Sequence, residues 1–390
     1  MTEQEAYVAF NLTEKVGSVR VDEMAAAAGG VVAAWEAYPH KVARAGGPVD
    51  WQAEFKKAAS FGVTLLTPAD EAYPRILRET PGHPLCLAVK GSVEALSKPA
   101  IALVGTRRAT AYGIDQATAL AHGLAQSGWM ILSGLALGID AAAHRGALDA
   151  DGVTVGVLGS ALDCFYPDEN RELAREIVRK GGAVVSEFPF GRTPDRETFP
   201  IRNHVVAALA RGVVAVEAPL KSGTLITAGL ALNLGRTVMA VPARVDNRMS
   251  GGCLTLIRDG ARLVRNADDV QEEMSELLPR RTDAGQGRRR AKTAPEAVSS
   301  GGGADGRQPD ASPEKGRVSP TAAFRSDDLP EITLEESIVL REVDTEGVSL
   351  EKLLVRTGLS PMKLNAICMT LRLKGRLRYL PGNCVARPFR

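Results

Sequence analysis

Six short apolar runs between residues 100 and 243 constrain the fold of this chain more than any other feature. Most of them end in glycine or a polar residue, and helical patterns separate each run from the next. The runs are 100–105, 129–134, 153–159, 182–187, 213–218 and 237–243. Strands that are apolar throughout are buried on both faces, which is typical of a parallel sheet. The alternation of strands and helices predicts an α/β domain of the doubly wound, Rossmann type.

The segments around this domain differ from it in composition. Residues 1–65 contain alanine-rich helical stretches broken by pairs of glycines, which predicts a small helical, SAM-like N-terminal domain. We expect the extended Rossmann-type domain to occupy residues 66–277. In 278–328 glycine, proline, serine and charged residues dominate and large apolar residues nearly vanish, so this segment is predicted to be a disordered linker.

The pattern of residues 329–390 predicts a C-terminal winged helix. Ser349 precedes one apolar periodic stretch, and Ser360-Pro361 is the start signal of a second helix. The stretch 376–388 follows as a β-wing. The second helix is basic only toward its end, and its apolar residues are Leu364, Ile367, Met369 and Leu371. Because readers of the major groove usually expose polar and basic residues, docking of a protein and weak binding of duplex DNA both stay open.

Charge and cysteine content limit the classes of function. The 390 residues carry a net charge of +2, so a nucleic-acid-binding face has to be a local basic patch. The five cysteines are scattered without a CxxC pair, which predicts neither a zinc site nor a disulfide framework. The chain has no uninterrupted apolar stretch of about 18 residues and no signal-peptide pattern. We therefore expect a cytoplasmic protein without a membrane segment.

The loop after the first apolar run is a candidate for anion binding, because ligands of open parallel sheets bind beyond the carboxyl ends of the strands. Gly105 permits a tight turn, the amide of Thr106 can face an anion, and Arg107 supplies a forked donor for phosphate. A GxGxxG motif and the acidic residue that would hold a ribose are both absent, which argues against NAD. A surface arginine after a structural glycine remains the alternative.

Two later loops add residues of the same kind. Phe199, Arg202 and Asn203 open a helix and place an aromatic ring beside a cation, as binding of single strands requires. A core contact is an equally good explanation for Phe199. The segment from Lys221 through Ser222 to Gly223 precedes another helix and predicts an anion pocket that is not a Walker loop.

Catalytic residues are not evident in these loops. Asp140 and His144 are four residues apart on one predicted helix face, where a structural role is favoured over that of a general base. No Ser–His–Asp set, carboxylate pair or metal cluster stands out, and the chain has only five histidines. The sequence predicts a protein that holds phosphate without catalytic residues, metal or cofactor.

Taken together, the loops resemble the DprA/Smf family over about 160 residues. The segment 66–77 and the terminal winged helix are also similar to parts of that family. The segments that carry the resemblance are GTRRATAYG (105–113), SGLALGIDAAAHRGAL (133–148), VLGSALDCFYPDEN (157–170), SEFPFG (186–191), FPIRN (199–203), EAPLKSGTLITAGLAL (217–232) and VPARVDNRMSGGCLTLIRDGA (241–261).

The resemblance implies a protein that binds single-stranded DNA, dimerises and loads RecA during natural transformation and recombination. It also implies a single-strand-binding protein as a further partner. The implied DNA contacts are Arg107, Phe199, Arg202, Asn203, Lys221 and Ser222, with Gly105, Thr106 and Gly223 shaping the backbone around them. The sequence departs from the family at Leu137, where arginine is common, and at Arg248, where proline is common.

Two other functions are weighed against this one. The lysine-decarboxylase-like phosphoribohydrolases use a PGGxGTxxE loop, whereas this chain has LKSGTLIT with Thr227 at the position of the catalytic glutamate. Without that carboxylate the hydrolase lacks its general acid/base. The second alternative is a regulator that binds duplex DNA through the winged helix. A truncation before about residue 330 separates these functions, since loss of all DNA binding would favour the regulator.

Overall fold

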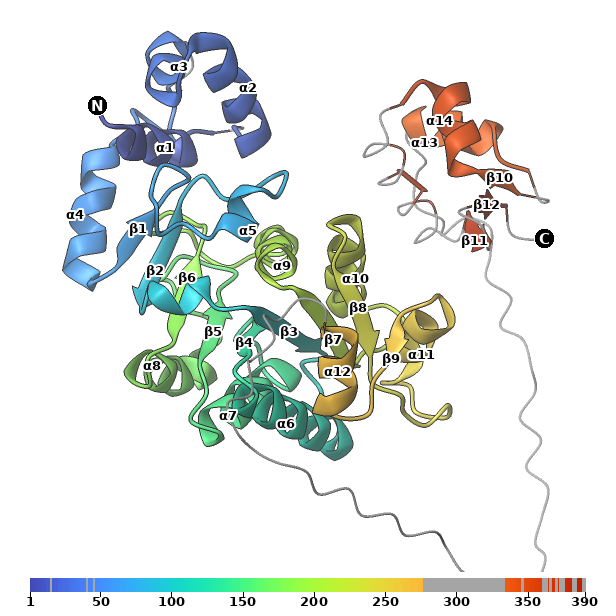
Figure 1. Cartoon of the computed structure of the whole chain (residues 1–390). Helices are drawn as coiled ribbons and strands as arrows, with labels where there is room; N and C mark the ends of the chain where they lie inside the picture. Colours follow the sequence, from blue (N-terminus) through green and yellow to red (C-terminus); the bar gives the residue numbers. More distant parts are fainter. Residues whose placement is uncertain are drawn as a thin grey trace, which may run out of the picture. The chain divides into compact units, whose positions relative to one another are not determined.

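A nine-stranded, mostly parallel sheet forms the centre of the N-terminal part of the chain in the computed structural model (Figure 1). The structure describes residues 1–275 except 15, 40 and 45, and then 334–344, 347–359, 364, 367–368, 371, 376–380 and 384–387. The linker predicted for 278–328 lies outside these residues. Among the described residues no helix is long and apolar enough to cross a membrane.

The sheet has the strand order β1-β2-β6-β5-β4-β3-β7-β8-β9. β1 and β2 are antiparallel to their neighbours, and all other pairs are parallel. The six apolar runs of the sequence are β3 to β8, so the predicted fold class is confirmed. The strands are β1 (Thr64–Leu66), β2 (Leu87–Gly91), β3 (Ala100–Gly105), β4 (Met130–Ser133), β5 (Thr154–Val157), β6 (Ala183–Ser186), β7 (Gly212–Glu217), β8 (Thr237–Ala240) and β9 (Arg262–Leu263).

Helices cover both faces of the sheet because the central strands are apolar on both faces. In β3, Ile101 and Leu103 pack toward one helix layer, while Ala102 and Val104 pack toward the other. The first layer contains α6 (Ala111–Gln126), α7 (Ile139–Asp149), α8 (Arg171–Arg179) and α12 (Ala267–Glu273). The second layer contains α5 (Arg75–Arg78), α9 (Thr198–Leu209), α10 (Gly223–Asn233) and α11 (Gly251–Arg258).

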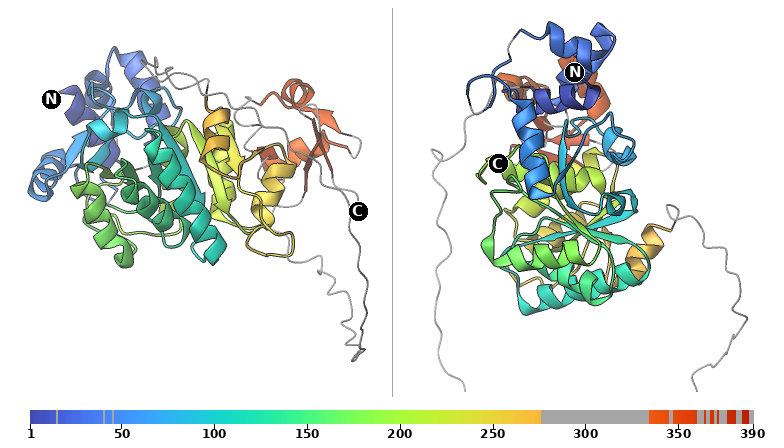
Figure 2. Two further views of the ribbon diagram at one scale, coloured as in Figure 1. Left: turned by 60° about the horizontal axis from the view of Figure 1, so that its bottom comes forward. Right: turned by 90° about the vertical axis from the view of Figure 1, so that its left-hand side faces the viewer.

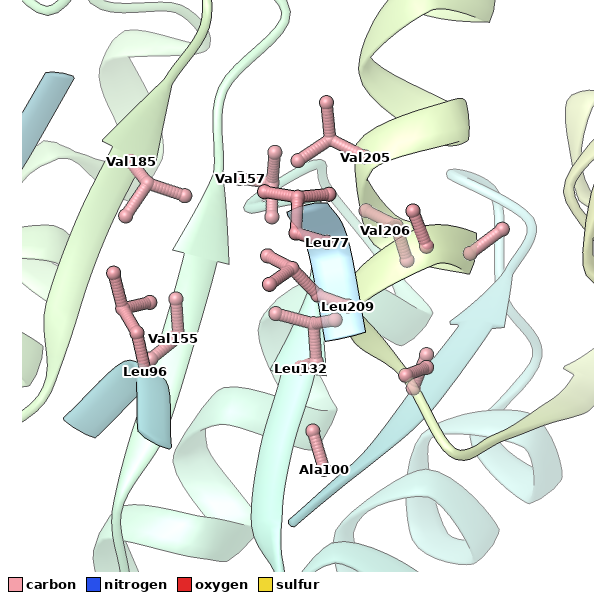
Figure 3. Close-up of a cluster of buried hydrophobic side chains, with 14 of the residues drawn as sticks. Leu77, Leu96, Ala100, Leu132, Val155, Val157, Val185, Val205, Val206 and Leu209 are labelled. Carbon is pink, nitrogen blue, oxygen red and sulfur yellow. The ribbon is translucent and has the colours of Figure 1, made fainter. Parts of the chain in front are cut away.

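Figure 3 shows the core between the sheet and α9. Val205 and Leu209 of α9 lie over Leu132 and Val157 of the neighbouring strands, and all four side chains are buried. Burial of this amount of apolar surface on both faces of the sheet is the main stabilising contribution to the domain. It also fixes α9 above β4 and β5, which matters because the first two turns of α9 carry Phe199 and Arg202.

The N-terminal residues form four helices that lie beside one edge of the sheet (Figure 2). Phe10 makes edge-on contacts with Trp35 and Tyr38, with ring centroids 5.1 and 5.7 Å apart. The last helix leads directly into β1, and the backbone N–H of Phe190 donates to Glu54 Oε1 at 2.9 Å. The helices are α1 (Glu3–Leu12), α2 (Ser18–Ala28), α3 (Val31–Ala37) and α4 (Trp51–Phe61).

The C-terminal part is a separate winged-helix domain, as predicted. Its sheet has the order β10-β12-β11 with antiparallel pairs. Ser349 caps α14 as the sequence indicates, because its Oγ accepts from the N–H of Lys352 at 3.3 Å. The elements are α13 (Leu334–Arg341), β10 (Val348–Ser349), α14 (Leu350–Thr357), β11 (Arg378–Leu380) and β12 (Cys384–Ala386).

The apolar residues of the second predicted helix of the winged-helix domain need a different interpretation from the one the sequence suggested. Leu364, Ile367 and Leu371 are buried together with Val339 and Val385 in the core of the small domain. They form the inward side of their helix, so their apolar character is no argument against a groove-reading surface. That argument is therefore wrong for these three residues, and Met369 lies outside the described residues.

Candidate nucleic-acid interface

The candidate site lies where the order of the strands reverses. From β3 the chain proceeds outward through β4, β5 and β6 and then returns to β7 on the other side of β3. The loops after β3 and β7 therefore lead into opposite helix layers and leave a crevice between them. A pocket of about 350 Å³, here called the switch-point pocket, occupies this crevice. The nine predicted DNA-binding residues line it: Gly105, Thr106, Arg107, Phe199, Arg202, Asn203, Lys221, Ser222 and Gly223.

Three exposed cations line this pocket: Arg107, Arg108 and Lys221. The guanidinium of Arg107 lies over the ring of Phe199, 4.5 Å from the ring centroid. Lys221 follows β7 in the loop that leads to α10. Within the described residues none of the three side chains forms an ion pair with a carboxylate, so all three charges are available to an anionic ligand. Cations beside an aromatic ring are the combination that single-strand binding uses.

The N-terminus of α10 also opens onto the pocket. Ser222 is the N-cap residue in an extended conformation, and its side chain makes no hydrogen bond to the helix. Its buried Oγ has no hydrogen-bond partner among the residues that the structure describes. The N–H groups of the first turn, beginning at Gly223 and Thr224, point along the helix toward the pocket and carry the positive end of the helix dipole. This end of α10 is suited to an anion.

Arg202 lies beneath the pocket rather than free within it. Its side chain is buried, its Nη1 donates to the carbonyl oxygens of Gly134 and Val157, the latter at 2.9 Å, and its Nε donates to Asn203 Oδ1 at 3.1 Å. Burial lowers the pKa of the guanidinium, and the nearby Asp140 opposes this effect. Arg202 therefore joins the loop after β4 to β5 and forms the pocket floor.

Asp140 completes this floor from the other side of Gly134. Its carboxylate is buried and accepts from the backbone N–H of Gly134 at 3.1 Å and of Ala136 at 3.4 Å. Burial raises the pKa of this carboxyl, and Arg202 together with the two amides opposes the rise. Gly134 lies tightly between the two side chains, because a Cβ there would be 1.9 Å from Arg202 Nη1.

Glu217 is a buried residue of the site that the sequence analysis missed. Its carboxylate accepts from the backbone N–H and the hydroxyl of Thr110, both at 2.8 Å, at the N-terminus of α6. Its backbone carbonyl accepts from the N–H of Thr106 at 2.8 Å. Glu217 thus ties the loop after β3 to the end of β7. The available signal was a glutamate at the end of a buried strand, with Gly113 leaving space for it on the facing helix.

The loop after β4 holds the loop after β3 in place. The N–H of Ile139 donates to the carbonyl oxygen of Thr106 at 3.3 Å. Gly138 has a φ of +77°, and a Cβ at this position would lie 2.4 Å from Thr106 O and 2.8 Å from Arg107 O. Only glycine allows this approach. The position of Arg107 therefore depends on a backbone contact with a different loop.

Asp140 and His144 do not form a catalytic pair. His144 is fully buried, and its Nδ1 lies 2.7 Å from Thr154 Oγ1. Thr154 donates its own hydroxyl to the carbonyl oxygen of Ile131 at 2.8 Å, so the imidazole must donate through Nδ1. Burial lowers the pKa of His144 to about 3. The residue is a neutral core histidine, which agrees with the structural role favoured by the sequence.

The low pKa of His144 predicts that acid destabilises the domain. Between pH 6.5 and about 3 the unfolded chain carries a proton on this imidazole that the folded chain lacks. The free energy of unfolding should therefore fall as the pH decreases, with a contribution from this group of about 1.4 kcal/mol per pH unit. Urea unfolding at pH 7, 6 and 5 measures the slope. His144→Asn should have a shallower slope, and parallel curves for the two proteins would refute the assignment.

A second, smaller pocket of about 20 Å³, here called the side pocket, shares a wall with the first. Both are lined by Arg107, Phe199 and Arg202. The side pocket adds Leu137 and Tyr166, of which the sequence analysis selected neither as a binding residue. Leu137, the family departure in the loop after β4, is 39% exposed, and Tyr166 is 47% exposed. The side pocket extends the site from the loop after β7 toward the loop after β5.

Two other sequence expectations concern residues near the pocket. Thr227 lines the switch-point pocket, and its hydroxyl donates to the carbonyl oxygen of Gly223 at 3.2 Å. The position where the phosphoribohydrolases carry a glutamate is therefore filled by a helix-bound hydroxyl. Arg248, the second family departure, is exposed but is not among the residues that line either pocket. In the described part of the chain no group of three or more His, Cys, Asp or Glu residues is arranged to hold a metal ion.

Fold and site together define a class of protein: a doubly wound α/β protein with a pocket lined by cations at its switch point and a separate winged helix. The model of the family described as DNA recombination-mediator protein A matches residues 64–275. That of the DprA winged helix domain matches residues 323–383. The chain belongs to the DNA recombination-mediator protein A (DprA/Smf) family.

Relatives of known name agree with this assignment. The chain is 45% identical over 224 residues to a putative DNA processing protein DprA of Mycobacterium tuberculosis, which covers 54% of this chain and 57% of that protein. It is 40% identical over 210 residues to Protein Smf of Synechocystis, covering 53% and 52%. The matches thus span about half the length of these two relatives. For the DNA processing protein DprA of Streptococcus pneumoniae the identity is 39% over 220 residues, covering 56% and 76%.

Two solved structures share the fold. The X-ray structure of DprA from Streptococcus pneumoniae has a TM-score of 0.59 and 32% identity, covering 70% of this chain and 98% of that chain. A structure of DNA processing protein A from Helicobacter pylori, described as giving its single-stranded DNA binding mode, has a TM-score of 0.50 and 30% identity. It covers 55% of this chain and 96% of that chain.

Proposed function

We propose that this chain binds single-stranded DNA in the switch-point pocket and loads RecA onto it in natural transformation and recombination. The observation that carries the proposal is the presence of three exposed cations, none of them in an ion pair within the described residues, beside the open N-terminus of α10. Asp140 is the one carboxylate among the described residues that line this pocket, and it is buried and hydrogen-bonded. Membership of the family and the single-stranded DNA binding mode of the Helicobacter pylori relative support DNA as the anion.

Contacts to the phosphates explain how such a site would accept many sequences. Arg107, Lys221 and the first amides of α10 supply donors for phosphate oxygens, which carry no sequence information. Arg202 holds the floor to which these donors are attached. Binding should be sequence-tolerant and should weaken as the salt concentration rises, because cations on the strand are released.

The partners of the protein are part of the same proposal. We infer a homodimer, which would place two pockets on one strand and raise the avidity without any new contact. RecA and a single-strand-binding protein are the proposed protein partners, and the cytoplasm is the proposed location. We further propose that the protein is not an enzyme. Thr227 at the position of the hydrolase glutamate supports this view.

The Lys221→Ala variant tests the pocket directly. We expect the variant to bind a labelled single-stranded oligonucleotide at least fivefold more weakly, because a charged hydrogen bond contributes about 1–3 kcal/mol. The slope of log K against log salt should decrease by about 0.7 for each lost phosphate contact. Fluorescence anisotropy at several salt concentrations measures both quantities. Lys98→Ala is the matched control, since Lys98 precedes β3 and is absent from both pockets.

An excess of unlabelled duplex DNA distinguishes this proposal from binding through the winged helix. Wild-type binding to the single strand should resist the duplex competitor. If the duplex displaces the strand fully and Lys221→Ala binds like the wild type, the pocket is not the binding site. The winged helix would then be the DNA-binding part of the chain and duplex DNA its ligand. A chain that ends before residue 330 would in that case lose all binding.

A further inference from the structure

The ring of Phe199 is largely occupied by the protein itself. The guanidinium of Arg107 covers one of its faces at 4.5 Å from the centroid. One edge of the ring packs on Gly159 so closely that a Cβ there would lie 2.9 Å from Phe199 Cδ1. A nucleobase stacking on this ring would have to displace Arg107 from the face. Phe199 is thus better placed to hold Arg107 in position than to receive a base.

Tyr166 is the aromatic residue of the site with an open face. Its ring centroid lies 6.4 Å from that of Phe199, with a tilt of 56° between the two planes. Aromatic pairs in contact have centroids about 4.5–7 Å apart, so no base fits between these two rings. The residue is 47% exposed, and its hydroxyl has no hydrogen-bond partner among the described residues. Its outer face is therefore free to receive a ligand.

The backbone around Tyr166 is anchored, so the ring is held in place before any ligand arrives. Pro167 and Asn170 are buried, and the side-chain amide of Asn170 donates to the carbonyl oxygen of Leu135 at 2.8 Å. The guanidinium of Arg171 covers the ring of Phe165 at 5.1 Å. An exposed aromatic ring on an anchored loop loses little conformational entropy on binding.

The surroundings of Tyr166 favour a nucleobase over a protein side chain as its ligand. The exposed face of an aromatic ring is itself flat and apolar, which suits a planar base. Leu137 extends the apolar rim beside the ring. The wall shared with the switch-point pocket carries Arg107, so a strand whose phosphates bind there reaches Tyr166 with its next bases. Every base has a π-face, which makes such a contact tolerant of sequence.

We propose that Tyr166 is a base-stacking residue of this protein, which rests on the proposed binding of single-stranded DNA. The strand crosses from the loop after β7, past Arg107, to the loop after β5, where a base lies on the outer face of the Tyr166 ring. In this arrangement the phosphates and the bases of the ligand are bound by different loops, all of which lie at the carboxyl ends of the parallel strands.

The experiment compares two substitutions on two ligands. Tyr166→Ala removes the ring, and Tyr166→Phe keeps it. The ligands are a labelled single-stranded oligonucleotide and the same backbone with a central run of abasic nucleotides. Tyr166→Ala should bind the base-bearing strand about tenfold more weakly, equivalent to about 1.4 kcal/mol. It should bind the abasic strand as the wild type does, and Tyr166→Phe should resemble the wild type on both strands.

Tyr112→Ala is the matched control, because Tyr112 is 43% exposed and lies outside both pockets. Thermal unfolding of all variants ensures that only folded proteins are compared. The proposal is overturned if Tyr166→Ala binds the base-bearing strand normally, or if it loses the same factor on both strands. Equal losses in folded Tyr166→Phe and Tyr166→Ala would overturn it as well. A wild-type chain that binds neither strand would refute the proposed function and with it this inference.

Discussion

Replacing Arg202 by methionine should lower the free energy of unfolding of the α/β domain by about 3 kcal/mol or more. Methionine keeps an unbranched stem but lacks the guanidinium, so it offers no donor to Gly134 O, Val157 O or Asn203 Oδ1, which Arg202 contacts. The substitution also leaves the buried Asp140 without its nearby positive charge. Breaking a buried ionic arrangement by removing one partner typically costs about 3–5 kcal/mol. Denaturant unfolding followed by circular dichroism measures this loss.

The double variant Arg202→Met with Asp140→Asn shows how much of the lost free energy of unfolding comes from leaving the buried Asp140 carboxylate without a cation. Asparagine keeps the shape of Asp140 but carries no charge, so it should recover part of the stability that Arg202→Met loses. A loss below about 1 kcal/mol for Arg202→Met would show that the guanidinium is not needed for the floor. Arg202 would in that case be available as a direct phosphate contact.

The Gly138→Ala variant should be destabilised by about 2–4 kcal/mol and should also bind DNA more weakly. A Cβ at Gly138 would lie within 2.4 Å of Thr106 O, and the backbone has a φ of +77° that alanine rarely adopts. Because the colliding atoms belong to backbone, the loop after β3 has to move, and Arg107 moves with it. Thermal unfolding and anisotropy with a single-stranded oligonucleotide measure the two effects.

Gly128→Ala separates the collision from the backbone conformation. Gly128 has a φ of +89°, but a Cβ there would meet no atom within 4 Å. Its substitution should therefore cost only the backbone strain, roughly 1 kcal/mol, and leave DNA binding unchanged. If Gly128→Ala and Gly138→Ala behave alike in both assays, the contact between the loops after β3 and β4 does not position the site.

The central fold was predictable because its strands are encoded locally. Each of β3 to β8 is an apolar run bounded by polar residues or glycine, and such a run has few other ways to be buried. The edge strands β1 and β9 were missed. β1 has three residues, and β9 has two residues that are both exposed. Neither strand is therefore long enough to form a periodic pattern. Their pairing depends on the neighbouring strand that is already in the sheet.

The loops of the site were predictable from topology, whereas their internal support was not. Once the strands are assigned, the loops after β3 and β7 must meet at the switch point, which brings Arg107 and Lys221 to one pocket. The contact of Glu217 with Thr110 joins residues 107 positions apart. The glutamate stands at the end of a buried strand, but nothing local in the sequence identifies Thr110 as its partner. The open face of Tyr166 depends on the packing of its neighbours in the same way.

The two edge strands of the sheet affect how copies of the protein behave when they lie close together. At one end β1 is short and runs directly out of α4. At the other end the two residues of β9 include Arg262, which pairs with Glu273 at 3.2 Å. Short, charged edge strands are poor templates for pairing with a strand of another chain. The sheets of neighbouring copies of this protein should therefore not join edge to edge into an aggregate.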